Sequence, residues 1–71
     1  MPLTAVYQKV VEGCIAFIEE VPGANTQGAT LDEARSNLAE ALEMVMEANR
    51  FIAEERIKGL DIIKEPFPLA A

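Results

Sequence analysis

One periodic pattern of apolar side chains constrains this sequence most, because it predicts a single helix over more than a third of the chain. Between Thr30 and Gly59, apolar residues recur every three or four positions, as on one face of a helix. The predicted inner stripe consists of Leu31, Ala34, Leu38, Ala41, Leu42, Val45, Asn49, Ile52 and Arg56. Thr30 and Glu33 form a predicted capping box at the start of the helix. Gly59 is a typical residue just beyond a helix end.

Two apolar segments before this helix predict a β-hairpin. Residues 3–11 and 14–20 are rich in β-branched and aromatic residues, and Glu12 and Gly13 lie between them. Both faces of the hairpin are partly apolar. If the helix covers one face, the other keeps exposed apolar side chains unless a second molecule covers it. The sequence does not choose between the two faces.

The segments around the hairpin and helix complete the predicted fold. Val21-Pro22-Gly23-Ala24 is a candidate type II turn, a short strand over about residues 25–27 follows, and Gly28 ends it. Residues 61–70 predict a last strand, which Pro66 and Pro68 place at an edge or take out of the sheet. We therefore expect an α+β fold of order β-β-β-α-β, with a small antiparallel sheet packed against one long helix, as one domain over residues 1–71.

The shortness of the chain implies association with another subunit or partner. A 71-residue chain has a marginal core of its own, and small domains usually add disulfides, a metal or a partner. Cys14 is the single cysteine and there is no histidine, so one chain forms neither an internal disulfide nor a nitrogen-and-sulfur metal site. We therefore expect a homodimer or homotetramer, and no cofactor.

Charge and hydropathy narrow the classes of partner. The net charge is −6 and the six basic residues are dispersed, which argues against direct binding to nucleic acid or to an anionic membrane. The N-terminus lacks the pattern of a signal peptide, and no stretch approaches the roughly 20 apolar residues of a membrane span. With a single thiol, the sequence is typical of a cytoplasmic protein.

Several side chains leave a structural and a functional interpretation open. Met44, Ala48 and Phe51 form a second apolar row beside the main stripe. With Phe67 they are candidate oligomer or partner contacts, although Met44, Met46 and Phe51 also suit an ordinary core. The polar side chains of Asn37 and Asn49 are predicted on or near the inner side of the helix, where they would bond the sheet or a partner.

Cys14 and Tyr7 are interpreted as packing residues. Cys14 has no histidine to activate it as a nucleophile and is followed by an apolar residue, so we expect a buried small side chain. Tyr7 would be able to stack on a base, but a single aromatic residue without interleaved basic residues is a weak nucleic-acid signal.

The run from Gly13 to about Leu42 resembles the HicB-like antitoxin family. The family pattern has a Pro-Gly turn, "TQG", a Thr-capped helix starting "T-L-x-E-A", and then "N-L-x-E-A-L". The matching residues are Pro22, Gly23, Thr26, Gln27, Gly28, Thr30, Leu31, Glu33, Ala34, Asn37, Leu38, Glu40, Ala41 and Leu42. The later segment "KGLDIIKEP" is similar to the family's helix end and final strand.

The resemblance implies a partly degraded ribonuclease H-like domain that forms homodimers or larger assemblies. Family members commonly neutralise a small RNA-cleaving toxin, HicA, and carry a C-terminal DNA-binding module, for which the sequence to Ala71 leaves no room. The leading hypothesis is therefore an antitoxin-like protein with a HicA-like partner. The alternative is an orphan homo-oligomeric module with a regulatory or ligand-binding role.

A ribonuclease H-type activity is not expected from the acidic residues. Such an enzyme needs carboxylates converging on Mg²⁺, one of them normally on the first strand, and residues 3–11 contain none. Glu19 and Glu20, with Asp32 and Glu33, would be able to form a cluster, but strand-end and capping roles explain them more simply. We expect no catalytic residues and no metal ligands.

Overall fold

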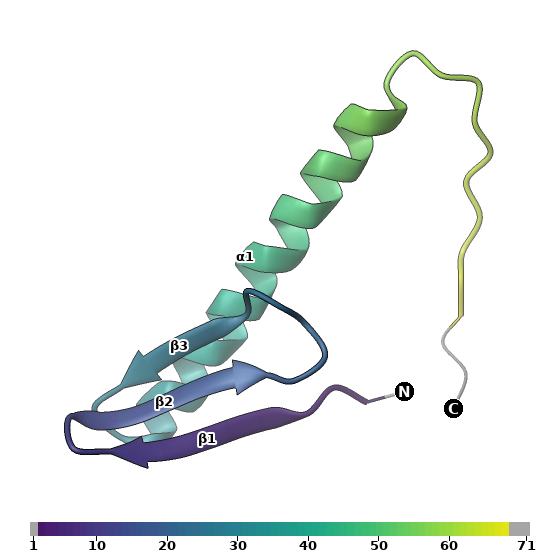
Figure 1. Ribbon diagram of the computed structural model, residues 1–71. Helices are drawn as coiled ribbons and strands as arrows, with labels where there is room; N and C mark the ends of the chain where they lie inside the picture. The colour runs from purple at the N-terminus through teal and green to yellow at the C-terminus, as the bar shows by residue number, and fades with distance from the viewer. Residues whose placement is uncertain (1, 69–71) are drawn as a thin grey trace.

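Three strands precede one long helix in the computed structural model, which describes residues 2–68 (Figure 1). The strands are β1 (Ala5–Val10), β2 (Gly13–Ile18) and β3 (Asn25–Gly28), and the helix is α1 (Leu31–Ile57). The strands form one antiparallel sheet of order β1-β2-β3. The α+β class, the hairpin, the short third strand and the single long helix are thereby confirmed.

The turn between β2 and β3 has the predicted geometry. The Ala24 amide donates to the Val21 carbonyl oxygen at 3.2 Å, and Gly23 has a φ of 92°, as the third position of a type II turn requires. Pro22 supplies the fixed φ of the second position. The Pro-Gly pair thus sets the direction in which the chain returns to the sheet.

Both predicted signals for the ends of α1 are confirmed, with one detail missing. The Glu33 amide donates to Thr30 Oγ1 at 3.1 Å, and Gly59, beyond the C-cap, has a φ of 77°. The reverse half of the capping box, a hydrogen bond from the Thr30 amide to the Glu33 carboxylate, does not form. One hydroxyl therefore caps the helix.

The face of β2 that carries Cys14, Ala16 and Ile18 meets the helix, which answers the question that the sequence left open. Ile15 and Phe17 point to the other face. The buried core consists of Cys14, Ala16, Ile18, Ala24, Ala34 and Leu38, with Tyr7, Val21, Leu42 and Val45 packed against it. It contains only small and medium side chains.

Two glycines allow the hairpin, β3 and the start of α1 to approach one another. A Cβ on Gly28 would lie 2.7 Å from the backbone nitrogen of Ala34, closer than real side chains come. Gly13 has a φ of +144°, and a Cβ there would meet the carbonyl oxygen of Gly28. Gly28 therefore has a packing role in addition to the predicted strand end.

The inner stripe predicted for the helix packs only between Ala34 and Val45, so the prediction is wrong for Leu31, which is 37% exposed, and for the residues beyond Val45. Asn49, Ile52 and Arg56 are exposed. The reason is length: the 27 residues of α1 extend about 40 Å, whereas the six residues of β2 extend about 20 Å. Figure 1 shows the helix continuing well past the sheet.

The last strand predicted for residues 61–70 does not form over residues 61–68, and residues 69 and 70 lie outside the described part. Residues 60–68, which we call the tail, turn at the end of α1 and run back in the direction of the sheet, apart from the helix (Figure 1). The tail is joined to α1 by Lys64 Nζ, which donates to Glu54 Oε1 at 2.8 Å. Pro66 and Pro68 lack the amide hydrogens that a β-ladder needs. The tail also begins at the end of a helix that extends past the sheet, so it starts away from the strands with which it would have to pair.

Candidate functional site

Two apolar surfaces are not covered by other parts of the chain. The first is the outer sheet face, which we define by Val6, Ile15 and Phe17. Phe17 pairs with Val6 on β1, and Ile15 pairs with Gln27 on β3, so these side chains share one face. Ile15 is 37% exposed and Phe17 is 43% exposed. A shallow hollow of about 420 Å³ lies along β2 and β3 beside Ile15 and Phe17. This face is therefore apolar and accessible.

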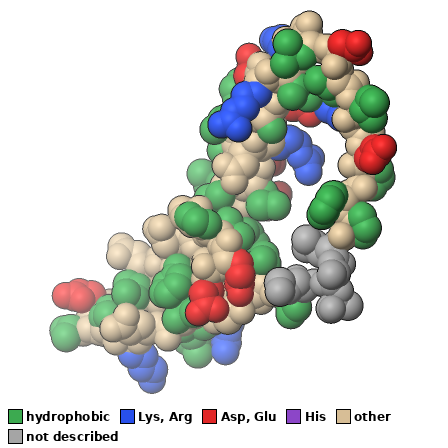
Figure 2. All heavy atoms as spheres, turned by 45° about the vertical axis from the view of Figure 1, so that its right-hand side comes forward, with side chains coloured by type: hydrophobic (Ala, Val, Ile, Leu, Met, Phe, Trp, Pro, Cys, Tyr) green, Lys and Arg blue, Asp and Glu red, His purple; other side chains and the backbone are tan. Residues whose placement is uncertain are grey.

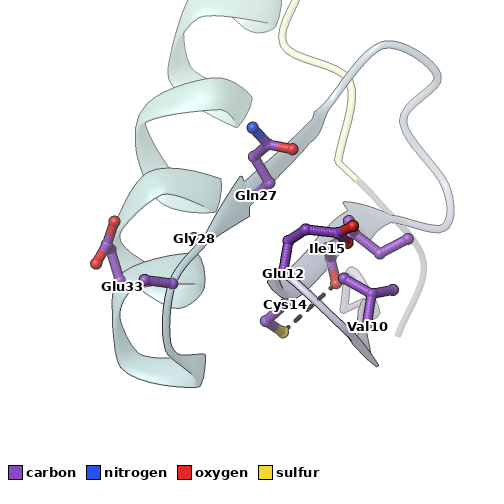
Figure 3. Close-up of a pocket in the computed structure, with 8 residues that line it drawn as sticks. Val10, Glu12, Cys14, Ile15, Gln27, Gly28 and Glu33 are labelled. Carbon is purple, nitrogen blue, oxygen red and sulfur yellow. Dashed lines mark hydrogen bonds between the residues drawn. The ribbon is translucent and has the colours of Figure 1, made fainter.

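A second hollow, of about 440 Å³, lies where the hairpin turn approaches the start of α1 (Figure 3). Glu12, Ile15 and Gln27 line it together with Val10, Cys14, Gly28, Ala29 and Glu33. Figure 3 shows the Glu33 carboxylate pointing away from Glu12, on the far side of Gly28. The two acids that line this hollow therefore do not converge on a common point.

Cys14 and Tyr7 occupy the packing positions predicted for them. Cys14 is 4% exposed, and its Sγ donates to the Ile15 carbonyl oxygen at 3.6 Å. Tyr7 is half-buried against the core, and the Arg35 guanidinium carbon lies 5.8 Å from the centre of its ring. The thiol is thus held inside the fold, at the wall of the second hollow.

Two of the four acidic residues considered as a metal cluster, Glu20 and Asp32, make separate contacts instead. Thr4 donates to the Glu20 carboxylate twice, through its amide at 2.6 Å and its hydroxyl at 2.7 Å. These two hydrogen bonds lower the pKa of Glu20 below its ordinary value of 4.5, and the bond from the Thr4 hydroxyl contributes more than the bond from the amide. Asp32 pairs with Arg35 at 2.9 Å on the surface. Within residues 2–68, no three His, Cys, Asp or Glu side chains gather closely enough to hold a metal ion.

The structure gives most of the family-motif residues a role in joining β3 to the helix. Asn37 Nδ2 donates to the Gln27 carbonyl oxygen at 2.9 Å, so Asn37 bonds the sheet. Thr26 lies opposite Ala16 on the half-buried side of β3, whereas the Gln27 side chain is exposed on the outer sheet face. Pro22, Gly23, Gly28, Thr30, Glu33, Ala34 and Leu38 serve the turn, the close approach, the helix start and the core.

The distal surface, defined by Met44, Met46, Ala48, Phe51 and Ile52, is the second uncovered apolar surface. Met44 is 69% exposed and Phe51 is 66% exposed, so neither belongs to the core of a single chain. Phe67, on the tail, is 91% exposed. Figure 2 shows hydrophobic side chains at the surface along the upper helix and along the tail. The contacts predicted for Met44, Ala48, Phe51 and Phe67 stay predictions.

The sequence did not single out Ile15 and Phe17 as contact residues, although a signal for them exists. Along β2, Cys14, Ala16 and Ile18 alternate with Ile15 and Phe17, and a strand places alternate residues on opposite faces. Once one set is buried, the other set must be exposed. What the alternation leaves open is which set the helix takes.

Comparisons with known proteins give the chain a family. No family model and no solved structure matches it. A UPF0150 protein of Thermotoga maritima is 46% identical over 33 residues, a match that covers 46% of this chain and 44% of that protein. A UPF0150 protein of Synechocystis sp. is 39% identical over 67 residues, covering 86% of this chain and 93% of that protein.

These comparisons add no activity. Among the described residues, no helix has the length and apolar character needed to cross a membrane. Neither relative's name states a substrate, a partner or a reaction. Because the similarity to the Synechocystis protein extends over nearly the whole of that relative, the chain belongs to the UPF0150 family.

Proposed function

We propose that this UPF0150 protein is an antitoxin-like module that binds and neutralises a small, basic, RNA-cleaving toxin of the HicA/HicB type. The observation that carries the proposal is the exposed outer sheet face on a strongly acidic part of the chain. Residues 2–45 contain seven acidic and two basic side chains. The motif run from Pro22 to Leu42, which resembles the HicB-like antitoxins, supports the same partner.

The chemistry of an RNA-cleaving partner complements this part of the molecule. A protein that binds RNA neutralises phosphates with Lys and Arg, so its RNA-binding surface is positively charged. Acidic residues around an apolar patch steer such a surface towards the patch, and buried aromatic anchors then supply most of the affinity. Phe17 is the aromatic anchor available on this face, and Glu12 lies beside Ile15 at its edge. Covering the toxin's basic surface would exclude RNA.

Co-expression with the small reading frame beside this gene tests the proposal. We expect rescue of growth and co-purification of a complex. Phe17→Asp should abolish both, because it places a charge in the centre of the outer sheet face. Leu60→Asp is the matched control, since Leu60 is 62% exposed and lies past the end of α1. Absence of a complex with the unaltered chain would reject the proposal.

The same proposal assigns the chain no nuclease activity of its own. Two of the four acids that were considered as a Mg²⁺ cluster, Glu20 and Asp32, bind Thr4 and Arg35 in separate places. We therefore expect the purified chain to leave RNA intact in the presence of Mg²⁺. Cleavage that is lost on adding a chelator would contradict this part of the proposal.

A second candidate function, a homo-oligomeric module without a toxin, is favoured by the distal surface. Its apolar side chains are exposed, and they lie away from the outer sheet face that we assign to the toxin. Such a module would form a stable oligomer by itself and would have no complex with a neighbouring gene product. The co-expression experiment separates the two candidates.

A further inference from the structure

The two edges of the sheet differ in how far the rest of the fold occupies them. On β3, the backbone groups of Asn25 and Gln27 point away from β2, because alternate residues of an antiparallel strand pair with each neighbour. The Asn25 amide donates to the Gly23 carbonyl oxygen at 3.0 Å, and the Gln27 carbonyl oxygen accepts from Asn37 at 2.9 Å. The turn and the helix therefore close part of this edge.

The outer edge of β1 is open instead. The Glu19 amide donates to the Thr4 carbonyl oxygen at 2.9 Å, so the backbone of Thr4 faces β2. The alternation of the ladder then turns the backbone groups of Ala5, Tyr7 and Lys9 outward. Within residues 2–68, none of these outward groups has a hydrogen-bond partner. Figure 1 shows β1 as an edge strand with no other described segment alongside it. Such an edge is a template for an added strand.

The side chains along β1 define what an added strand would meet. Val6 and Val10 are half-buried on the outer sheet face, whereas Tyr7 and Lys9 lie on the face toward α1. The Arg35 guanidinium carbon lies 5.8 Å from the centre of the Tyr7 ring. An added strand would therefore meet apolar side chains on one face and basic side chains on the other.

Lys9 is the cation that a partner would meet first. Lys9 and Arg35 are the two basic side chains of residues 2–45, and both flank this edge. Arg35 is already paired with Asp32 at 2.9 Å, whereas Lys9 is exposed. A hollow of about 360 Å³ lies beside Lys9, between β1 and the start of α1, and gives an incoming side chain room. This face of the edge thus suits a carboxylate.

The chain itself supplies no suitable strand for this edge. Lys64 holds the tail to Glu54, near the far end of α1, at 2.8 Å. Pro66 and Pro68 lack the amide hydrogens that a ladder needs. The β1 strand of a second copy contains no acidic residue to face Lys9. The open edge therefore fits a strand from a different protein.

We propose that the outer edge of β1 binds an extended segment of a partner protein in which apolar and acidic residues alternate. The segment adds an antiparallel strand to the sheet, and its backbone pairs with Ala5, Tyr7 and Lys9. Its apolar side chains extend the outer sheet face beside Val6 and Val10, and its acidic side chains face Lys9. The inference goes beyond the proposed toxin complex, which depends on a basic partner and on the outer sheet face.

Amide hydrogen exchange tests the position of the added strand. The probe is a short synthetic peptide with blocked ends in which Val and Glu alternate, added to the full chain. It should slow exchange at Ala5, Tyr7 and Lys9 by about 10-fold or more, because these amides gain acceptors. The amides of Val6 and Gln8, which face β2, should change less. Protection that grows with protein concentration in the chain alone would assign the edge to a second copy and overturn the proposal.

Methylated peptides separate strand addition from other modes of binding. In an antiparallel pair, residues directly opposite each other share a face, so the Glu residues of the peptide present their amides to Tyr7 and Lys9. N-Methylation of the Glu residues should abolish binding, since it removes these donors. N-Methylation of the Val residues is the matched control and should retain most of the affinity. Equal weakening by the two modifications would overturn the proposal.

Charge exchange tests the acidic character of the segment. Lys9→Glu should weaken binding of the Val-Glu peptide by about 10-fold or more. Lys58→Glu, beyond the end of α1, is the matched control and should leave binding unchanged. Circular dichroism checks that both variants fold. A peptide with Lys in place of Glu should bind the Lys9→Glu chain better than the unaltered chain. Affinities that ignore these exchanges would contradict the proposal.

Discussion

The two halves of α1 carry the same apolar period but have different surroundings. In residues 31–45, Ala34 and Leu38 are buried against the sheet, with Leu42 and Val45 packed beside them. In residues 46–57, Ile52 continues the same stripe and is 50% exposed. The difference teaches that a periodic pattern specifies which side of a helix is apolar, whereas the length of the sheet decides how much of that side one chain can bury.

The largest expected effect compares a core residue with its counterpart on the distal half. In protein diluted until it is monomeric, Leu38→Ala should lower the free energy of unfolding by about 2–5 kcal/mol, because it empties space in a small core. Ile52→Ala should change it by less than about 0.5 kcal/mol. Urea unfolding followed by circular dichroism measures both. Equal losses would mean that the distal half is packed within a single chain.

A smaller difference in the free energy of unfolding is expected between glycine substitutions before the start of the helix and after its end. Gly28→Ala should cost about 2–3 kcal/mol of unfolding free energy, since the new Cβ meets the backbone at Ala34. Gly59→Ala should cost about 1 kcal/mol. A Cβ at Gly59 meets nothing within 4 Å, and only the positive φ opposes it. Thermal unfolding of the two variants checks the order; a larger loss at Gly59 would contradict it.

The helix cap gives a more modest test of the proximal half. Thr30→Ala should lower the free energy of unfolding by about 1 kcal/mol, because the Glu33 amide loses its acceptor. Thr30→Ser keeps the oxygen and should retain most of the stability. Amide hydrogen exchange should show the added opening confined to the first turn. Faster exchange in residues 46–57 as well would show that the halves open together.

The smallest expected effect concerns the exposed carboxylate of Glu20, which accepts two hydrogen bonds from Thr4 at one end of the sheet. The pKa of Glu20 is lowered, so its ionised form stabilises the fold above the ordinary pKa of about 4.5. That stabilisation is lost as the pH falls through the lowered pKa of the folded state. Thr4→Val should raise the Glu20 pKa towards its ordinary value in an NMR titration. Thr4→Ser retains the hydroxyl and should leave it lowered; an unchanged pKa in Thr4→Val would contradict the assignment.

Much of the fold follows from local signals. Pro22 and Gly23 predicted the turn, Thr30 predicted the helix start, and Gly59 predicted its end, because each depends on the backbone preferences of a few neighbouring residues. The last strand was wrong over residues 61–68 because a strand requires a neighbouring backbone. Local composition does not say whether such a neighbour lies within reach.

The candidate surfaces were predictable to a lesser degree. The second apolar row of Met44, Ala48 and Phe51 was visible in the spacing, but the same spacing would have suited a core. Ile15 and Phe17 became candidates only when the helix was seen to cover Cys14 and Ala16. Asn37 had two possible partners until its 2.9 Å hydrogen bond to Gln27 chose the sheet.

The sequence alone determined the hairpin, the turn, the capped helix and the excess of apolar faces, since these depend mainly on residues near one another in the chain. Only the tertiary structure decided which hairpin face the helix covers and where burial along the helix stops. Those outcomes depend on the close approach at Gly13 and Gly28 and on the unequal lengths of sheet and helix. They are distances in space, which no local pattern encodes.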